Sequence, residues 1–227
     1  MNAMMANEGT TTTRRTFVTE TAAAMGVAAL SSVVGCSKEQ KEDNKEETMD
    51  MKFSELIEAR RSVRKYAKAK ISKDEMAKIV EEALNAPSWK NTETTRYYAA
   101  IGEDVKAKIW SDALPGFNAA SSANAAALVA VTFVPGESGY AGDAPANELG
   151  EMWGAYDCGL ASAYFILVAK NHGWDTLIMG IRDKAKVKSI LGIPEKEVLM
   201  SVIAVGKSAQ PYFKNPRKPV AEVLKTV

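Results

Sequence analysis

Two short segments, 127–134 (ALVAVTFV) and 198–206 (VLMSVIAVG), are apolar along their whole length and rich in β-branched residues. A strand with one face in solvent alternates apolar and polar side chains, and these segments do not alternate. We therefore expect them to be central strands of a sheet that helices cover on both faces. A further strand is expected at 96–102 (RYYAAIG). Because the strands lie singly between helical segments, the chain is predicted to fold as an α/β sandwich.

The clearest helix is predicted in the segment 71–88, where Ser72 and Glu75 form a capping box and Pro87 prevents continuation. A second and much longer helix is predicted over 148–171. The uncharged stretch of this helix is too short to cross a bilayer. We therefore interpret it as a core helix, or as a helix buried at a subunit interface.

The first 36 residues are expected to be a targeting signal rather than part of the fold. Arg14 and Arg15 precede an Ala-rich apolar run that ends at Cys36. The string TRRTFV resembles a twin-arginine export signal, and SVVGC resembles a bacterial lipobox, in which cleavage before the cysteine leaves it to be acylated. These features predict export across the cytoplasmic membrane and a lipid anchor on the periplasmic or cell-surface side. The alternative is an N-terminal amphipathic helix with an incidental arginine pair and cysteine.

The segment 37–50 carries mixed charges and has no apolar residue before Met49. Such a segment cannot bury enough apolar surface to fold, so we expect it to be a solvated tether. The predicted organisation is a signal in residues 1–36, a charged tether in 37–50 and one folded domain in 51–227.

The composition excludes several classes of protein. A formal net charge of +1 gives no electrostatic reason to expect nucleic acid binding. The single histidine, His172, leaves little material for Ser–His or metal chemistry, and no metal site is predicted. If Cys36 is acylated, Cys158 has no disulfide partner. Because Cys158 lies in an apolar run, we expect a small buried residue rather than a reactive thiol.

The candidate chemistry lies in the segment EARRSVRKY, where three arginines surround Ser62 at a predicted helix end. Guanidinium groups bind phosphate through paired, charge-assisted hydrogen bonds, and a hydroxyl adds a further donor. The segment is therefore a candidate phosphate clamp. The alternative is a solvated basic face.

Four more motifs follow in order along the chain: APSWKN, GWDTLIMGIRD, IAVG and NPRKP. Together with EARRSVRKY, they resemble the FMN-dependent nitroreductase family over about Phe53 to Val223. The resemblance implies a three-layer α-β-α sandwich of the nitroreductase type with a mostly antiparallel central sheet. It also implies FMN as the cofactor and an intertwined homodimer.

The resemblance further assigns roles to single residues. The FMN phosphate, the ribityl chain and the carbonyl side of the ring would be held by four residues of the first motif: Arg60, Arg61, Ser62 and Arg64. Arg217 would place a second basic group on the phosphate. Backbone N–H groups around Met179 and Gly180 would face the flavin N5 region.

The turn APSWKN resembles the segment that reaches the flavin of the neighbouring subunit in family dimers. It nominates four residues: Pro87, Ser88, Trp89 and Asn91. The chain departs from the family's pattern at two places. Family members often carry a basic residue where this chain has Asn215, and they usually have Gln, Pro and Trp where this chain has Glu93, Thr94 and Thr95.

The resemblance implies a two-electron, ping-pong reduction of nitroaromatics, quinones or a related small acceptor. The donor would be NAD(P)H or, for an exported protein, a quinol. Because the cofactor performs this chemistry, no catalytic acid, base or metal is expected. The backbone of Gly180 near N5, and Arg61 or Arg64 near the N1 and O2 edge, would stabilise the reduced flavin.

The segment 110–126 is expected to be a flexible lid or a plain surface loop beside the acceptor. Two alternative functions stay open, because a fold does not determine a substrate. One is a reductive dehalogenase-like branch of the same fold. The other is an exported lipoprotein that binds a ligand without turnover.

Overall fold

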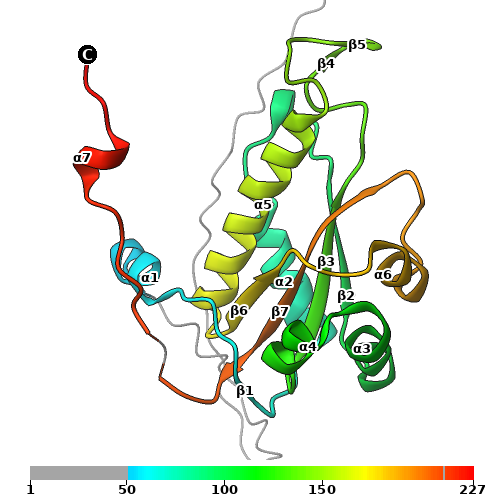
Figure 1. The fold of residues 1–227 in the computed structure, drawn as a ribbon, viewed down its shortest axis with the longest axis vertical. Helices are drawn as coiled ribbons and strands as arrows, with labels where there is room; N and C mark the ends of the chain where they lie inside the picture. The colour runs from blue at the N-terminus through cyan, green and yellow to red at the C-terminus, as the bar shows by residue number, and fades with distance from the viewer. Residues whose placement is uncertain (1–50, 212) are drawn as a thin grey trace, which may run out of the picture. The chain divides into compact units, whose positions relative to one another are not determined.

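Strands β3 (Ala127–Phe133) and β7 (Val198–Ser208) form the centre of a sheet (Figure 1). The structure is a computed structural model that describes residues 51–211 and 213–227. Strand β2 (Thr95–Ala100) pairs with β3, while β6 (Asp175–Met179) and the short β1 (Tyr66–Ala67) pair with β7. These pairings are all antiparallel, which confirms the mostly antiparallel sheet and its two central strands.

Helices cover both faces of the sheet. One layer contains α3 (Glu103–Lys108) and α6 (Lys184–Leu191), and the other contains α2 (Lys73–Ala83) and α5 (Met152–Asn171). Successive residues of β3 point into different layers, since Leu128 belongs to the core under α6 and Val129 to the core under α5. The lack of alternation in the sequence follows from this double burial, and the α-β-α sandwich is confirmed.

The N-cap of α2 forms as predicted, because the backbone N–H of Glu75 donates to Ser72 Oγ over 3.0 Å. The second half of the predicted capping box is replaced by a tertiary contact, in which Glu75 Oε1 accepts the indole N–H of Trp174 over 2.6 Å. Met76, Ile79 and Ala83 are buried on one face of this helix. The remaining elements are α1 (Phe53–Ala59), α4 (Gly116–Ser122), α7 (Val220–Val223), β4 (Tyr140–Ala141), β5 (Ala144–Pro145), a 3₁₀-helix (Trp89–Asn91) and a π-helix (Ile109–Ala113).

The long helix α5 begins at Met152, four residues later than predicted. The chain makes a turn before it, with Gly150 at a φ of 44° and the Met152 N–H donating to Leu149 O over 2.9 Å. Contrary to the expectation from its uncharged stretch, α5 is long and apolar enough to cross a membrane by length and composition. It nevertheless buries Cys158 and Phe165 toward the sheet, as a core helix does.

The prediction of a plain surface loop at 110–126 is wrong, because most of the segment is helical, while the alternative of a lid stays a prediction. A π-helix (Ile109–Ala113) is followed by α4, and the indole N–H of Trp110 donates to Ser122 Oγ over 3.0 Å. Asn118 and Ser122 are buried. Small residues let this segment pack closely as helix, and sequence composition alone does not reveal that packing.

The predicted signal in 1–36, the lipidation site Cys36 and the tether in 37–50 lie outside the described residues.

Candidate cofactor site

The basic segment 60–64 lies in extended conformation along the edge of the sheet. It leaves α1 at Arg60, whose backbone is already extended, and the Val63 N–H donates to Thr176 O on β6 over 3.0 Å. Ser62 forms a parallel bridge with Thr176. Val63 is buried, so it anchors the segment in the core while its neighbours line a cavity.

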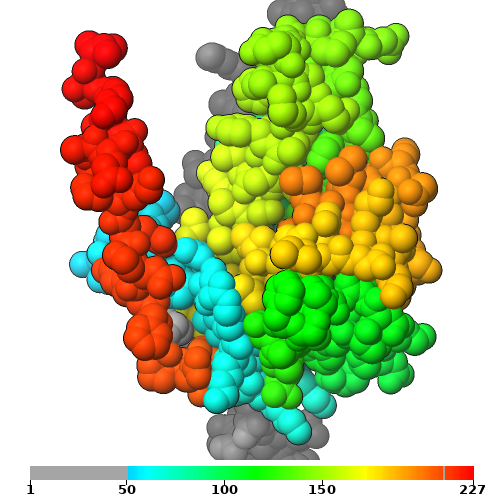
Figure 2. Space-filling view, in the orientation of Figure 1, coloured from blue at the N-terminus to red at the C-terminus, as the bar shows by residue number. Residues whose placement is uncertain are grey.

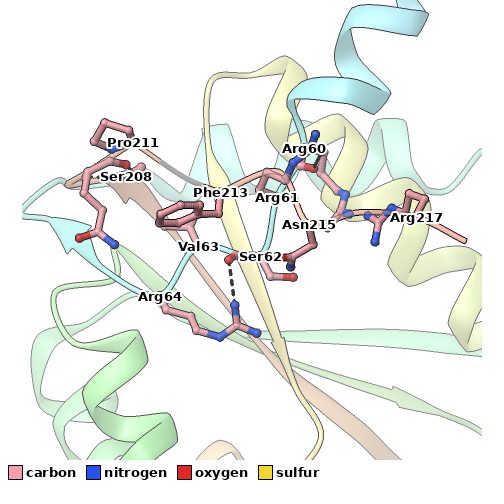
Figure 3. Close-up of a pocket in the computed structure, with 11 residues that line it drawn as sticks. Arg60, Arg61, Ser62, Val63, Arg64, Ser208, Pro211, Phe213, Asn215 and Arg217 are labelled. Atoms are coloured by element: carbon pink, nitrogen blue, oxygen red, sulfur yellow. Dashed lines mark hydrogen bonds between the residues drawn. The ribbon is translucent and has the colours of Figure 1, made fainter.

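This cavity has a volume of about 470 Å³ and lies between the segment 60–64 and the chain that follows β7 (Figure 3). It brings together five predicted site residues: Arg60, Arg61, Ser62, Arg64 and Arg217. Other lining residues come from the C-terminal side, among them Ser208, Gln210, Phe213 and Asn215. The two segments meet because Ala209 N–H donates to Lys65 O over 2.9 Å beside the β1–β7 pair.

The cavity is strongly electropositive. Four arginines and no carboxylate are found among the described residues that line it. The pKa of the Arg60 guanidinium is lowered, mainly by burial and to a smaller extent by repulsion from Arg61 and Arg217. Within the described part of the chain, none of the four arginines forms an ion pair. Such a cluster favours a bound anion, because an anion removes the repulsion between the guanidinium groups.

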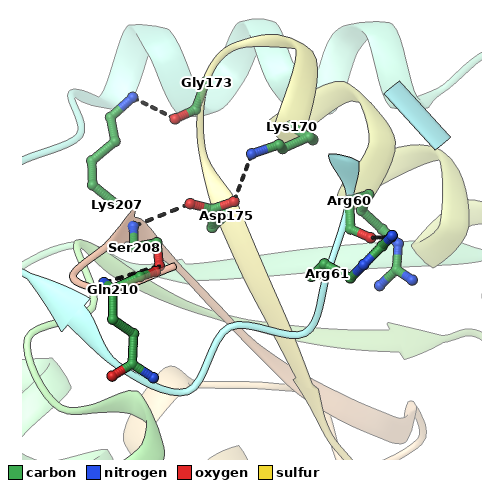
Figure 4. Close-up of polar contacts among 8 residues, drawn as sticks. All are labelled: Arg60, Arg61, Lys170, Gly173, Asp175, Lys207, Ser208 and Gln210. Atoms are coloured by element: carbon green, nitrogen blue, oxygen red, sulfur yellow. Dashed lines mark hydrogen bonds and ion pairs between the residues drawn. The ribbon is translucent and has the colours of Figure 1, made fainter. Parts of the chain in front are cut away.

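A buried polar network lies beneath one wall of the cavity (Figure 4). Lys170 Nζ on α5 pairs with Asp175 Oδ1 on β6 over 2.8 Å, and Asp175 Oδ2 accepts the Ser208 N–H over 3.1 Å. Lys207 Nζ donates to Gly173 O over 2.6 Å and lies 4.0 Å from the centre of the Trp174 ring. The network fixes the end of β7, and with it the start of the C-terminal wall.

Gly180 follows the end of β6 and is exposed, whereas Met179 is buried. A Cβ built on Gly180 would meet no described atom within 4 Å, so the backbone here is open to a ligand. The next residues are held firmly. Asn118 Nδ2 donates to Ile181 O, and Asp183 N–H donates to Ala113 O, each over 2.7 Å.

The turn that contains Pro87, Ser88, Trp89 and Asn91 does not line this cavity within one chain. Pro87 and Ser88 line a separate cavity of about 30 Å³, beneath the turn and beside Asp157. The Trp89 ring packs against Trp153 with 4.9 Å between ring centres. The structure therefore separates the predicted site residues into three groups within the chain: the five that line the arginine cavity, the four in the turn, and Met179 with Gly180, which line neither cavity.

Residues 93–95 differ from the family's usual Gln, Pro and Trp, and hydrogen bonds of Glu93 hold the turn in place. Glu93 N–H donates to Ser88 Oγ over 3.0 Å, and Asn91 Nδ2 donates to Glu93 Oε1 over 2.8 Å. Thr94 is buried, and Thr95 begins β2 opposite Phe133.

Sequence reasoning missed Ser208, Gln210 and Phe213, which line the cavity without belonging to a charged motif. It also missed Asp157, whose only signal was its position as a lone acid in an apolar helix. Cys158 has the predicted character. It is 1% exposed, and burial raises the pKa of its thiol to about 11, so the side chain is an unreactive core residue.

Comparisons with known proteins give a consistent result. The chain is 29% identical over 198 residues to YdgI of Bacillus subtilis, a candidate NAD(P)H nitroreductase. That alignment covers 74% of this chain and 94% of YdgI. It is also 28% identical over 191 residues to the CLA biosynthesis enone reductase of Lactiplantibacillus plantarum, and that alignment covers 70% of this chain and 86% of the reductase.

A crystal structure of a candidate nitroreductase from Exiguobacterium sibiricum, in complex with FMN, superimposes with a TM-score of 0.69 at 26% identity. The match covers 78% of this chain and 98% of that one. The model of the nitroreductase family matches residues 57–207. This range contains the arginine segment, the turn before β2 and the sheet, and the chain therefore belongs to the nitroreductase family.

Proposed function

We propose that this protein is an FMN-dependent oxidoreductase that reduces a small acceptor such as a nitroaromatic or a quinone. One observation carries the proposal: four arginines without a carboxylate surround a cavity at the sheet edge where the first family motif lies. A solved relative of the same fold contains FMN. A phosphate-bearing cofactor fits this cluster, because phosphate accepts the paired hydrogen bonds that guanidinium groups donate.

The described residues suit the different parts of FMN. Arg60, Arg61 and Arg217 supply positive charge for its phosphate, and Ser62 supplies a hydroxyl. Arg64, whose Nη1 donates to Ser62 O over 3.2 Å, supplies a cation that favours a reduced, anionic ring. The open backbone at Gly180 suits a planar ring that approaches closely. When bound, FMN would supply the chemistry, a two-electron reduction and reoxidation.

NAD(P)H is the proposed electron donor, since relatives such as YdgI are named as NAD(P)H nitroreductases. Export would remove the protein from nicotinamide cofactors, and a quinol is then the donor that we propose. The motif pattern of residues 14–36 supports export by the twin-arginine route and a lipid anchor at Cys36. The twin-arginine route carries folded proteins, as a protein that takes up FMN in the cytoplasm requires.

We also propose a homodimer. The face of α5 that points away from the sheet exposes Met152, Tyr156, Gly159, Ala163 and Tyr164. Met152 and Tyr156 are 57% and 59% exposed, which is unusual for apolar side chains aligned on one helix face. A second subunit packed on this face would bury them.

The C-terminal arm, residues 213–227, supports an intertwined dimer. It extends away from the domain in Figure 1 and Figure 2, and four apolar residues on it are exposed: Val220, Val223, Leu224 and Val227. Docking of this arm on a second subunit would remove these side chains from water. In such a dimer the turn at 87–91 would meet the partner's cofactor cavity, as the family pattern implies.

The test is the visible absorption spectrum of the purified protein under anaerobic conditions, before and after addition of NADH, NADPH or a menaquinol analogue. We expect flavin absorbance that one of these donors bleaches. Loss of the bound flavin in Arg217→Ala, with retention in the surface control Lys184→Ala, would tie the flavin to the arginine cavity. A colourless protein that does not take up added FMN would contradict the proposal and favour ligand binding without turnover.

A further inference from the structure

The turn 88–93 is held in an unfavourable backbone conformation. Three of its non-glycine residues have positive φ angles: Lys90 at 46°, Asn91 at 56° and Glu93 at 49°. L-residues rarely adopt this left-handed conformation, because Cβ approaches the following carbonyl oxygen too closely. A turn with three such residues persists only where the surrounding structure determines it, and strain of this kind is concentrated at functional sites.

Asp157 on α5 is the group that fixes the start of this turn. Its Oδ2 accepts the backbone N–H of Trp89 over 2.9 Å and the hydroxyl of Ser138 over 2.6 Å. The residue is 3% exposed. Among the described residues its hydrogen-bond donors are two neutral groups, the Trp89 N–H in the turn and the Ser138 hydroxyl in the segment after β3.

A buried carboxylate without a cation is costly to desolvate. An asparagine or a serine would be a cheaper acceptor for these two donors if only packing were at stake. The carboxylate contributes something specific, since hydrogen bonds to a charged acceptor are shorter and stronger than neutral ones. It ties the strained turn to the rigid 20-residue helix α5.

The aromatic contacts agree with this role. Trp89 packs on Trp153, and Trp153 packs edge-on against Tyr156, with 4.9 Å and 5.5 Å between ring centres. Trp153 and Tyr156 lie within one turn of Asp157 on the same helix. The exposed face of α5 and the turn are thus parts of one surface, the surface that a second subunit would contact.

We propose that Asp157 is a positioning residue that acts on the cofactor cavity of the partner subunit. It holds the turn 88–93 in the conformation that closes the partner's arginine cavity over FMN. The inference rests on the proposed function, because it requires an FMN site and a dimer.

The first test compares three variants of the full-length protein: Asp157→Ala, Asp157→Asn and Ser162→Ala. Asp157→Ala removes the acceptor and should weaken FMN binding about tenfold, the size of a lost hydrogen bond to a charged group. Asp157→Asn retains a neutral oxygen for the Trp89 N–H but loses the charge, so it should weaken FMN binding by a smaller factor than Asp157→Ala. Ser162→Ala, a buried polar change on the same helix, is the matched control.

Two readouts are needed, flavin titration for FMN affinity and hydrogen exchange of the amides in 88–96 for the turn. Without FMN, Asp157→Ala should speed amide hydrogen exchange at Trp89 and Glu93 only. A general loss of stability would instead speed exchange throughout the protein. If Asp157→Ala does not fold, Ser138→Ala should shift both readouts in the same direction by a smaller factor. Unchanged FMN affinity in a folded variant would overturn the inference.

The second test uses mixed dimers in which one subunit carries Asp157→Ala and the other carries Arg217→Ala. If the turn acts across the interface, one site combines intact arginines with an intact turn and binds FMN with wild-type affinity. If it acts within its own subunit, each site carries one defect and no wild-type site appears, which would overturn the inference. Wild-type protein that binds no FMN would instead contradict the proposed function itself.

Discussion

Asn215 lines the arginine cavity at a position where members of the family often carry a basic residue. We expect Asn215→Lys to tighten FMN binding by about three- to tenfold at low ionic strength, because a cation is added close to a phosphate. The gain should shrink in 1 M salt, where the Debye length falls to about 3 Å. Titration of FMN at two salt concentrations measures both effects.

Ser189→Lys is the control for this prediction, since it adds the same charge on α6 outside the lining of the cavity. Its FMN affinity should not change. Equal effects of the two substitutions would show that net charge, and not the cavity, determines the affinity.

At the scale of elements, the buried pair Lys170–Asp175 joins the end of α5 to the start of β6, and through Ser208 to the end of β7. Lys170→Met leaves the Asp175 carboxylate buried without its cation and should lower the free energy of unfolding by about 3–5 kcal/mol. Addition of Asp175→Asn removes the uncompensated charge and retains an acceptor for the Ser208 N–H. The double variant should therefore recover part of the loss in urea unfolding.

An exposed ion pair provides the comparison. Lys186 Nζ lies 3.9 Å from Asp183 Oδ2 on the surface of α6. Lys186→Met should change the free energy of unfolding by less than about 1 kcal/mol. If Lys170→Met also lowered the free energy of unfolding by less than about 1 kcal/mol, the buried Lys170–Asp175 pair would not stabilise the packing of α5, β6 and β7.

At the scale of the whole molecule, Gly159 lies in the middle of the exposed face of α5, and a Cβ built on it would meet no described atom within 4 Å. In a monomer, Gly159→Arg should raise the free energy of unfolding by roughly 0.5–1 kcal/mol, because arginine is the better helix former. In a dimer packed on this face, the same change should separate the subunits. Light scattering after size exclusion distinguishes the two results, and Lys184→Arg serves as the neutral control.

Export is a second property of the whole chain and depends on residues 1–36, outside the described part. Substitution of both Arg14 and Arg15 by Lys should leave the protein in the cytoplasm with FMN still bound, since the cavity residues are unchanged. Cell fractionation and the flavin spectrum of each fraction test this. Efficient export of the doubly substituted protein would exclude the twin-arginine route.

The sequence predicted several helices and strands correctly, because the patterns that indicate them involve residues close together in the chain. Unbroken apolar runs predicted β3 and β7, and Ser72 with Glu75 predicted the start of α2. Prediction failed where distant contacts decide. The segment 110–126 forms a π-helix and α4, and hydrogen bonds fix it to the backbone of Ile181 and Asp183, which lie 63 residues after Asn118 and 70 residues after Ala113.

By itself, the sequence determined the α-β-α class, the arginine segment and the family, since these depend on periodicity and on the order of motifs. The tertiary structure decided the cavity, because the pairings of Val63 with Thr176 and of Lys65 with Ala209 bring Arg60 beside Arg217. It also assigned Asp157 to the turn at Trp89, 68 residues earlier. The physical reason is that hydrogen bonds and burial depend on distance in space, and the spacing of residues along a chain does not specify that distance.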